Sequence, residues 1–335
     1  MQTQQMNYGL KRVYNFVIVT YLMFLRKEPF MKNFWKYAKY IRLIFNNMVI
    51  RIFFRRPKMN KKYYASLCTI FKNEAPYLKE WVDYHLIVGF EHFYIYNNFS
   101  DDNYKEVLEP YIKKGLLTLI EWPIPAGQTL AYNDCVEKFS DESHWIAFQD
   151  ADEFAVPVKY NNIKDWLKKF EKFPCVLGFY RNFSSNGVIH EDYKYVIETF
   201  TSCTKFKSPS MFLNTYHTKK IKYFKLTHFA RFKFFNKVCA QYPAVFCGLT
   251  DEIKSPEFQF NHYYCKSYDY FVNKKMTRGD AYRIDLGRSL NDDFYRTELE
   301  SMNKNFVIFK YLTKLKMFDL EEYCKEKELS KKSPE

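Results

Sequence analysis

Between residues 63 and 148, segments with strand character alternate with segments of helical periodicity, and this alternation constrains the fold more than any other feature. The β-rich runs predict strands at residues 63–71, 92–96, 116–122 and 144–148. Helical patterns separate them, over residues 81–88, 107–111 and 129–139. Such alternation is typical of a mostly parallel sheet whose ligand site lies at the carboxyl ends of the strands. We therefore predict an α/β fold, a mostly parallel sheet with flanking helices.

The positive charge of the chain is concentrated in residues 1–62, here called the basic arm, which hold 14 Lys or Arg and one acidic residue, Glu28. The rest of the chain carries 38 basic and 37 acidic side chains, so it has no overall attraction for a phosphate backbone. The longest uncharged run of the arm, residues 13–25, is shorter than the roughly 20 residues that span a bilayer. No small-residue cleavage site follows that run. We expect no transmembrane anchor, no cleaved signal peptide and no nucleic-acid partner.

Apolar residues of the basic arm recur at steps of three or four, which on a helix forms one narrow stripe. They are Phe30, Phe34, Tyr37, Ile41, Phe45, Met48 and Ile52. Lys32, Lys36, Lys39 and Arg42 fall on or near the opposite face. This pattern predicts an amphipathic helix that lies on an anionic membrane surface. The alternative is a helix packed on the body of the protein, with its charges merely solvated.

Two carboxylates follow the strand predicted at residues 144–148. In an extended segment, Asp150 and Asp152 would point to the same side, where they could share a divalent cation or bind a ribose and a metal. A lone DxD motif is also compatible with a solvated strand end or a helix cap. The surrounding motifs favour the first interpretation.

Several ordered segments over roughly residues 64–280 resemble the glycosyltransferases of family 92, formerly a domain of unknown function, and their bacterial family-2-like relatives. The segments are FKNEAPYLKEWVDYHLIVGFEHFYIYNNFSDD (71–102), GQTLAYNDC (127–135), HWIAFQDADEFAVP (144–157), NFSSNG (182–187) and NHYYCKSYDYFVNKKMTRGDA (261–281). The resemblance implies a GT-A, Rossmann-like fold that binds a nucleotide-sugar donor. It also implies that Asp150 and Asp152 hold a divalent metal, Mn²⁺ or Mg²⁺, on the donor diphosphate.

The resemblance carries further donor-binding roles to particular positions. Asn73, Glu74 and Asn97 match the loops that surround base and ribose. Lys72 stands where these families often have Arg, and Asn97 where they often have Asp, which leaves the base selectivity open. Gln128 and Asn133 match a helix whose start faces the donor, although both could be ordinary capping and packing residues.

His262 ends the alternating run of residues 258–262, which places it on the face of Phe258 and Phe260. That pattern is usual for a core histidine. The resemblance makes it instead the residue that completes the metal site, where neutral imidazole beside carboxylates suits Mn²⁺.

After His262, Ser267 can cap a helix on which Lys266, Lys274 and Arg278 recur at multiples of four and form one basic stripe. Such a stripe is often only solvated. Next to a diphosphate, these cations would neutralise the leaving nucleoside diphosphate.

An inverting transferase also needs a general base for the acceptor hydroxyl. Asp251 and Glu252 are the candidate pair, about a hundred residues beyond the DxD motif, unless they form only a surface turn. Asn186 and Gly187 form a turn that we expect to shape the acceptor cleft rather than to react.

We divide the chain into the basic arm (1–62), a nucleotide-sugar-binding half (63–160), an acceptor-binding half (161–290) and a C-terminal helical segment (291–335). The predicted function is metal-dependent transfer of one sugar from a nucleotide-sugar donor to a glycan or glycolipid acceptor, with inversion, in surface-polysaccharide biosynthesis. The predicted location is cytoplasmic and peripheral, on the inner face of a membrane. The alternative is a non-catalytic sugar- or lipid-binding membrane-surface protein on a transferase scaffold, which the intact DxD motif and His262 disfavour.

Overall fold

The computed structural model describes the body of the chain with short gaps. The described residues are 52, 58, 60–173, 175–206, 209–214, 221–226, 229–232, 257–278 and 287–332. Nearly all of the basic arm lies outside the described residues. So do Asp251 and Glu252, the two candidates for the general base.

The predicted alternation of strands and helices is confirmed. The strands are β1 (Tyr63–Phe71), β2 (His92–Asn97), β3 (Leu117–Glu121) and β4 (Ser143–Phe148). The connecting helices are α3 (Ala75–Val88), α4 (Tyr104–Lys113) and α5 (Gln128–Phe139). The four strands are parallel in the order β3-β2-β1-β4, with Cys68 of β1 between Tyr94 of β2 and Phe148 of β4.

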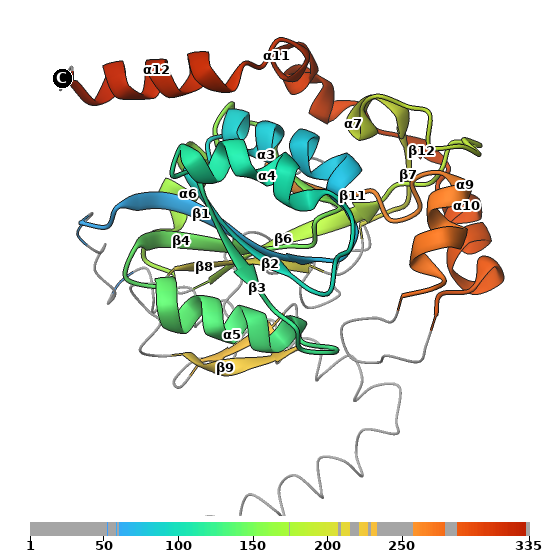
Figure 1. Ribbon diagram of the computed structural model, residues 1–335, viewed down its shortest axis with the longest axis horizontal. Coiled ribbons are helices and arrows are strands. Elements are labelled where there is room, and N and C mark those ends of the chain that lie inside the picture. Colours follow the sequence, from blue (N-terminus) through green and yellow to red (C-terminus); the bar gives the residue numbers. More distant parts are fainter. Residues whose placement is uncertain are drawn as a thin grey trace, which may run out of the picture.

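Helices cover both faces of this sheet, with α3 and α4 on one side and α5 on the other (Figure 1). The alternation of side chains along β2 explains the two layers. Phe93 and Ile95 pack into the larger core with Trp81 of α3, whereas Tyr94 and Tyr96 pack into a second core against α5. Burying a side chain such as Phe93 or Ile95 contributes about 1.5–3 kcal/mol relative to exposure.

The second half of the sheet mixes strand directions. It contains β5 (Glu153–Pro157), β6 (Cys175–Asn182), β8 (Pro209–Asn214) and β11 (Phe258–His262), in the order β4-β8-β6-β11-β5. Strand β8 is antiparallel to both β4 and β6, β11 is parallel to β6, and β5 is antiparallel to β11. This arrangement brings β11, from late in the chain, beside β5.

Short elements complete the second half. They are α6 (Ile163–Leu167), η2 (Lys168–Phe170), α7 (Val196–Thr199), β7 (Ser202–Cys203), β9 (Ile221–Leu226), β10 (Phe229–Phe232), α9 (Tyr268–Tyr270) and the π-helix η4 (Phe271–Lys275). Strands β9 and β10 form an antiparallel pair.

Beyond residue 289 the chain is mainly helical. The elements are η5 (Leu290–Tyr295), α10 (Arg296–Glu300), β12 (Asn303–Lys304), η6 (Val307–Tyr311), α11 (Leu312–Lys316) and α12 (Leu320–Lys332). Ile308, Tyr311 and Leu315 join the larger core, and Tyr311 stacks edge-on against Tyr84 of α3. Figure 1 shows α11 and α12 beyond α3, on the same side of the sheet. Within the part of the chain that the structure describes, no helix combines the length and apolar character needed to cross a membrane.

Candidate active site

The site is built around the turn between β4 and β5, residues 149–153, at the carboxyl end of β4. The segment that the sequence predicted to be extended is instead a turn at Ala151 and Asp152, and β5 begins at Glu153. The turn breaks the simple alternation of side chains. As a result, Asp150 and Asp152 contact different elements of the fold.

Asp150 faces the start of α5, as the position of Gln128 predicts. The amide Nε2 of Gln128 donates to Asp150 Oδ1 at 2.6 Å and also lies 2.9 Å from the Tyr132 hydroxyl. The backbone N–H of Asp150 donates to Glu153 Oε2 at 3.3 Å. Asp150 is half-buried, so one carboxylate of the turn is both held in place and open to a ligand. Asn133 lies on the same helix, half-buried.

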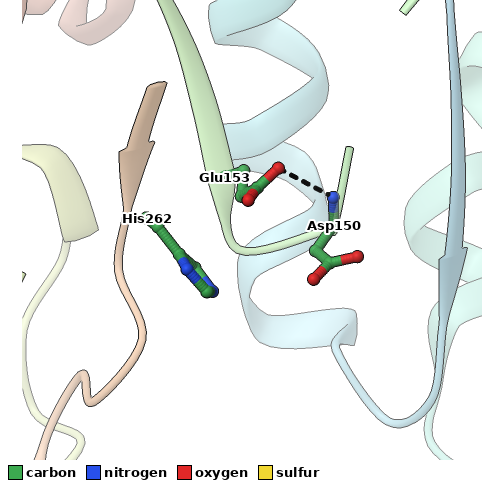
Figure 2. A group of neighbouring side chains, drawn as sticks. All are labelled: Asp150, Glu153 and His262. Carbon is green, nitrogen blue, oxygen red and sulfur yellow. Dashed lines mark hydrogen bonds between the residues drawn. The ribbon is translucent and has the colours of Figure 1, made fainter. Parts of the chain in front are cut away.

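His262 reaches this turn through the pairing of β11 with β5, in which it lies directly opposite Glu153. Asp150, Glu153 and His262 each offer a ligand atom, and these atoms all lie within 4.8 Å of one another. Figure 2 shows the three side chains around a common space. Glu153 and His262 are buried, and a carboxylate–carboxylate–imidazole set of this kind suits a divalent cation.

Asp152 points toward η4. Its Oδ2 accepts from Lys275 Nζ at 2.5 Å, and its Oδ1 lies 3.3 Å from Nε2 of His262. Although burial opposes ionisation, Lys275 and His262 hold the pKa of the Asp152 carboxyl well below its usual range. Asp152 is therefore an anion with a buried ammonium partner.

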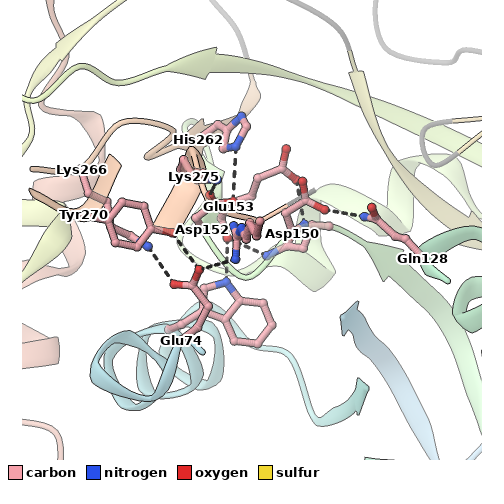
Figure 3. A network of polar contacts seen from close by, with 12 residues as sticks. Glu74, Gln128, Asp150, Asp152, Glu153, His262, Lys266, Tyr270 and Lys275 are labelled. Carbon is pink, nitrogen blue, oxygen red and sulfur yellow. Dashed lines mark hydrogen bonds and ion pairs between the residues drawn. The ribbon is translucent and has the colours of Figure 1, made fainter. Parts of the chain in front are cut away.

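A second buried ionic cluster lies beside the turn and centres on Glu74, the residue before α3 (Figure 3). Glu74 Oε2 accepts from Lys266 Nζ at 3.0 Å, and Oε1 accepts from the Tyr270 hydroxyl at 2.7 Å and from Arg278 Nη1 at 2.9 Å. Burial alone would raise the pKa of Glu74, but Lys266 and Arg278 lower it to about 2. Burial lowers the pKa of Lys266 to about 8, although Glu74 and Asp152 act in the opposite direction.

The three cations of the predicted basic stripe lie around Tyr270 and Glu74, although not along one regular α-helix. Ser267 does cap a helix, since its hydroxyl accepts from the Tyr270 backbone N–H at 3.2 Å. Lys266, however, precedes the cap and is 1% exposed, with its ammonium 3.9 Å from the ring centre of Tyr270. Lys266, before the π-helix η4, and Arg278, after it, both pair with Glu74. Lys274 is half-buried and forms no ion pair with any described residue.

Asn73 and Asn97, which were predicted to bind base and ribose, form hydrogen bonds in the loops that follow β1 and β2. Asn73, which has a left-handed φ of 54°, accepts at Oδ1 from the Asp101 backbone N–H at 2.9 Å. Asn97 donates to Glu121 at 2.6 Å and to the Tyr104 hydroxyl at 2.8 Å, and its Oδ1 accepts from a backbone N–H. The side chain of Asn97 is buried and its hydrogen-bonding groups are engaged, so it shapes the loop.

Buried side chains of α3 hold the turn between β4 and β5 in place through hydrogen bonds. Trp81 Nε1 donates to the backbone carbonyl of Glu153 at 2.8 Å. His85 donates from Nδ1 to the Trp81 carbonyl at 2.7 Å, so its Nε2 accepts from Gln149 Nε2 at 2.9 Å and from the Ala155 N–H at 3.2 Å. Burial lowers the pKa of His85 to about 3, which keeps this ring neutral.

Residues 61–243, more than half of the chain, match the sequence profile described as Glycosyltransferase family 92. The chain belongs to glycosyltransferase family 92.

Curated members of family 92 match this chain over a limited region. A family 92 protein of Arabidopsis thaliana is 33% identical over 101 residues, which is 30% of this chain and 18% of that protein. The beta-1,4-galactosyltransferase galt-1 of Caenorhabditis elegans is 30% identical over 110 residues, 29% of this chain and 26% of that enzyme. The matches thus span about a fifth to a quarter of these relatives.

Solved structures give a more distant likeness. The S. aureus TarS structure of residues 1-349 has a TM-score of 0.32 and 15% identity, and the match covers 47% of this chain and 48% of that fragment. The same TarS fragment in complex with UDP-GlcNAc has a TM-score of 0.31 and 16% identity, over 47% of this chain and 46% of the fragment.

Two residues of the candidate site, Glu153 and Lys275, were not among the predicted site residues. Glu153 follows the DxD motif directly, so a motif read as DADE would have included it. Lys275 is one position from the predicted Lys274, at the end of the π-helix η4, and donates to Asp152.

Proposed function

We propose that this family 92 chain is a metal-dependent GT-A glycosyltransferase that moves one sugar, with inversion, from a nucleotide-sugar donor to a glycan or glycolipid in surface-polysaccharide biosynthesis. The observation that carries the proposal is the convergence of Asp150, Glu153 and His262 within 4.8 Å, at the carboxyl end of β4. Ligands of α/β sheets bind at that edge. Family membership supports glycosyl transfer as the reaction.

The residues present fit a divalent cation. Asp150, Asp152, Glu153 and His262 are the candidate ligand residues. The Nδ1 atom of His262 is buried and has no hydrogen-bond partner among the described residues, as expected for a nitrogen that binds a metal. When bound, the cation would neutralise charge on the donor diphosphate.

The chain's own side chains would position the metal ligands, stabilise the leaving group and supply the general base. Gln128 holds the carboxylate of Asp150 in place, and the Glu74 cluster fixes the loop that precedes α3. Lys274 has no carboxylate partner among the described residues, so its ammonium would be able to stabilise the leaving diphosphate. We propose Asp251 and Glu252 as the pair from which the general base comes, and Asn186 and Gly187 as part of the acceptor cleft.

The basic arm supports a location at the cytoplasmic face of a membrane. Its charge of +13 would attract anionic lipid, and its apolar stripe would enter the interface. Such a location would give the enzyme access to a glycolipid acceptor.

A donor screen tests the proposed reaction. Thermal shift with a panel of nucleotide sugars, each with and without Mn²⁺, should single out one donor, because a ligand that binds only the native state raises its apparent stability. Release of nucleoside diphosphate from that donor should depend on Mn²⁺ and fall strongly in Asp150→Asn. A donor that binds but is never turned over, with any acceptor offered, would instead support the non-catalytic binding protein.

A further inference from the structure

Asn182, at the end of β6, carries a buried amide beside the candidate site. Strand β6 runs parallel to β11, and Asn182 lies directly opposite His262 in that pair. Residues opposed across neighbouring strands carry their side chains on the same face of the sheet. Because His262 lies opposite Glu153 of β5 in turn, Asn182 continues the row of site residues on the side of His262 away from Glu153.

The backbone of Asn182 is fixed by hydrogen bonds on both sides. Its N–H donates to Oγ1 of Thr204 at 3.2 Å, and its carbonyl accepts from the Thr204 N–H at 2.9 Å. The next residue, Phe183, donates its N–H to the carbonyl of His262 at 2.8 Å. The side chain of Asn182 is therefore presented from a rigid position, which lowers the cost of ordering a binding group.

The side-chain amide of Asn182, in contrast, has an unpaired atom. The residue is 9% exposed, and its Oδ1 is buried without a hydrogen-bond partner among the described residues. A buried polar atom without a partner is unfavourable and uncommon in native proteins. A half-turn of the amide exchanges its oxygen and nitrogen, so the group can offer either an acceptor or a donor at the same point. A ligand with a polar group there would complete its hydrogen bonding.

The chemistry of the amide indicates which ligand group it suits. An amide is neutral and both donates and accepts, as a hydroxyl group does, whereas phosphate oxygens only accept and are better matched by cations such as Lys274. Tyr180, two residues before Asn182 on the same face, is half-buried, and its ring lies edge-on to His262 at 5.2 Å. An aromatic wall with a few placed polar groups is typical of a small-molecule site.

The position of Asn182 also separates it from the acidic cluster. Neighbouring strands lie about 4.8 Å apart, so Asn182 is one strand spacing from His262 and two from Glu153. The amide thus borders the place proposed for the diphosphate without belonging to it. It lies on the β6 side, within the predicted acceptor-binding half.

We propose that the amide of Asn182 binds a sugar hydroxyl in the active site, of the donor sugar or of the acceptor. The inference rests on the proposed function and adds a residue that contacts the sugar itself. A site built to hydrogen-bond a substrate hydroxyl rejects analogues that lack it, so Asn182 contributes to sugar selectivity.

The full chain carrying Asn182→Ala tests this with the nucleotide sugar that the thermal-shift panel selects and with the matching nucleoside diphosphate, both with Mn²⁺. If the amide binds the donor sugar, affinity for the nucleotide sugar should fall about tenfold, as for one lost hydrogen bond, while the nucleoside diphosphate binds as before. If the amide binds the acceptor, donor binding stays unchanged. The KM for a saccharide acceptor, chosen from a panel of methyl glycosides, should then rise about tenfold.

Deoxy analogues of the sugar locate the contact. The wild type should bind the analogue that lacks the bonded hydroxyl more weakly than the parent sugar. Asn182→Ala should bind both equally, because the partner of that hydroxyl has been removed. A purely structural role of Asn182 would not produce this loss of discrimination.

Asn261→Ala is the matched control. Asn261 is a buried residue of β11 beside His262, and successive residues of a strand face opposite sides. Its amide is engaged, since Nδ2 donates to the Tyr263 hydroxyl at 3.2 Å and Oδ1 accepts from Gln259 Nε2 at 2.6 Å. We expect Asn261→Ala to lower the urea midpoint of unfolding and to leave the affinities unchanged. Asn182→Ala should do the reverse, because its buried Oδ1 has no bond to lose.

Three results would overturn the proposal. If Asn182→Ala weakens binding of the nucleoside diphosphate as much as that of the nucleotide sugar, Asn182 supports His262 and not the sugar. If the folded variant binds, transfers and discriminates deoxy analogues as the wild type does, the amide contacts no substrate, while the proposed function stands. If the wild type binds no nucleotide sugar, the proposed function fails and this inference with it. Asn182→Ser, measured in parallel, decides the question where the alanine variant does not fold.

Discussion

At the scale of single residues, Glu74 connects the loop before α3 to the segment around η4. It is 2% exposed and bonds two cations, Lys266 and Arg278. Glu74→Gln keeps the shape but leaves the buried ammonium of Lys266 without its counter-charge. We expect the free energy of unfolding to fall by about 3–5 kcal/mol, the usual cost of breaking a buried ion pair from one side. Urea titration near neutral pH measures it, and Glu109→Gln, on an exposed pair, is the control.

The same residue predicts an acid dependence of stability. The pKa of Glu74 is about 2 in the folded protein, against an ordinary value of 4.5. A carboxyl with a lowered folded pKa contributes stability that is complete above its unfolded pKa and is lost as pH falls toward the folded pKa. The stability difference between wild type and Glu74→Gln should therefore shrink as pH falls below about 5. A difference that stays unchanged down to pH 3 would contradict the ionic role of Glu74.

Asp251 and Glu252, the two candidates for the general base, give a prediction on activity. Glu252→Gln or Asp251→Asn should slow transfer to the acceptor by about 10²–10⁴-fold, because a general base acts on the acceptor proton in the transition state. Donor binding, followed by thermal shift, should change little. If both single variants transfer sugar at the wild-type rate, the base is another residue.

Residue roles were harder to predict than residue positions. The sequence places Asp150, Gln128 and His262 near one another, because each lies at the end of a strand or the start of a helix at one edge of the sheet. The partners of Asp152 and Lys266 could not be predicted, since they depend on a turn and on a π-helix that change the local periodicity. The approach of His262 to Glu153 follows from cross-strand pairing, which joins segments about a hundred residues apart.

At the scale of elements, the end of α3 offers a prediction on stability. Gly89 ends the helix with φ of 110°, and its N–H bonds the carbonyls of His85 and Leu86. An added Cβ would lie 2.4 Å from the side chain of Asn162, which caps α6. Gly89→Ala therefore adds a steric clash to the cost of a left-handed residue, about 1–2 kcal/mol.

Gly115 provides a matched control for Gly89. It also has a positive φ, of 67°, but a Cβ there would meet nothing within 4 Å. Gly115→Ala should show the conformational cost alone, and Gly89→Ala a clearly larger loss in the same urea titration. Equal losses would mean that α6 moves away from the end of α3 without penalty.

The first four strands were predictable because each combines apolar side chains with polar loops, and the observed bounds agree within two residues. The antiparallel insertion of β8 between β4 and β6 was not predictable in this way. Local periodicity indicates that a segment is a strand, but long-range packing decides which strand lies beside it. The pairing of β11 with β5 was not predictable for the same reason, because it too depends on long-range packing.

At the scale of the whole molecule, the proposed membrane association depends on the basic arm, which lies outside the described residues apart from a few positions. The body beyond residue 62 is nearly neutral. Electrostatic attraction to a bilayer would therefore come from the arm, and removing it separates the two parts of the proposal, sugar transfer and location.

A chain that starts at Lys62 should lose membrane binding and keep donor turnover. Each Lys or Arg near an anionic surface contributes about 1 kcal/mol, so even half of the 14 basic residues of the arm, added to its aromatic stripe, would hold the full chain on vesicles. Sedimentation with anionic and with neutral liposomes measures this. The full chain should pellet only with anionic vesicles and be released by high salt, because surface charge is screened within a Debye length of about 10 Å at 0.1 M. If both chains behave alike, the arm packs on the enzyme or serves another partner, and its charge does not direct the protein to a membrane.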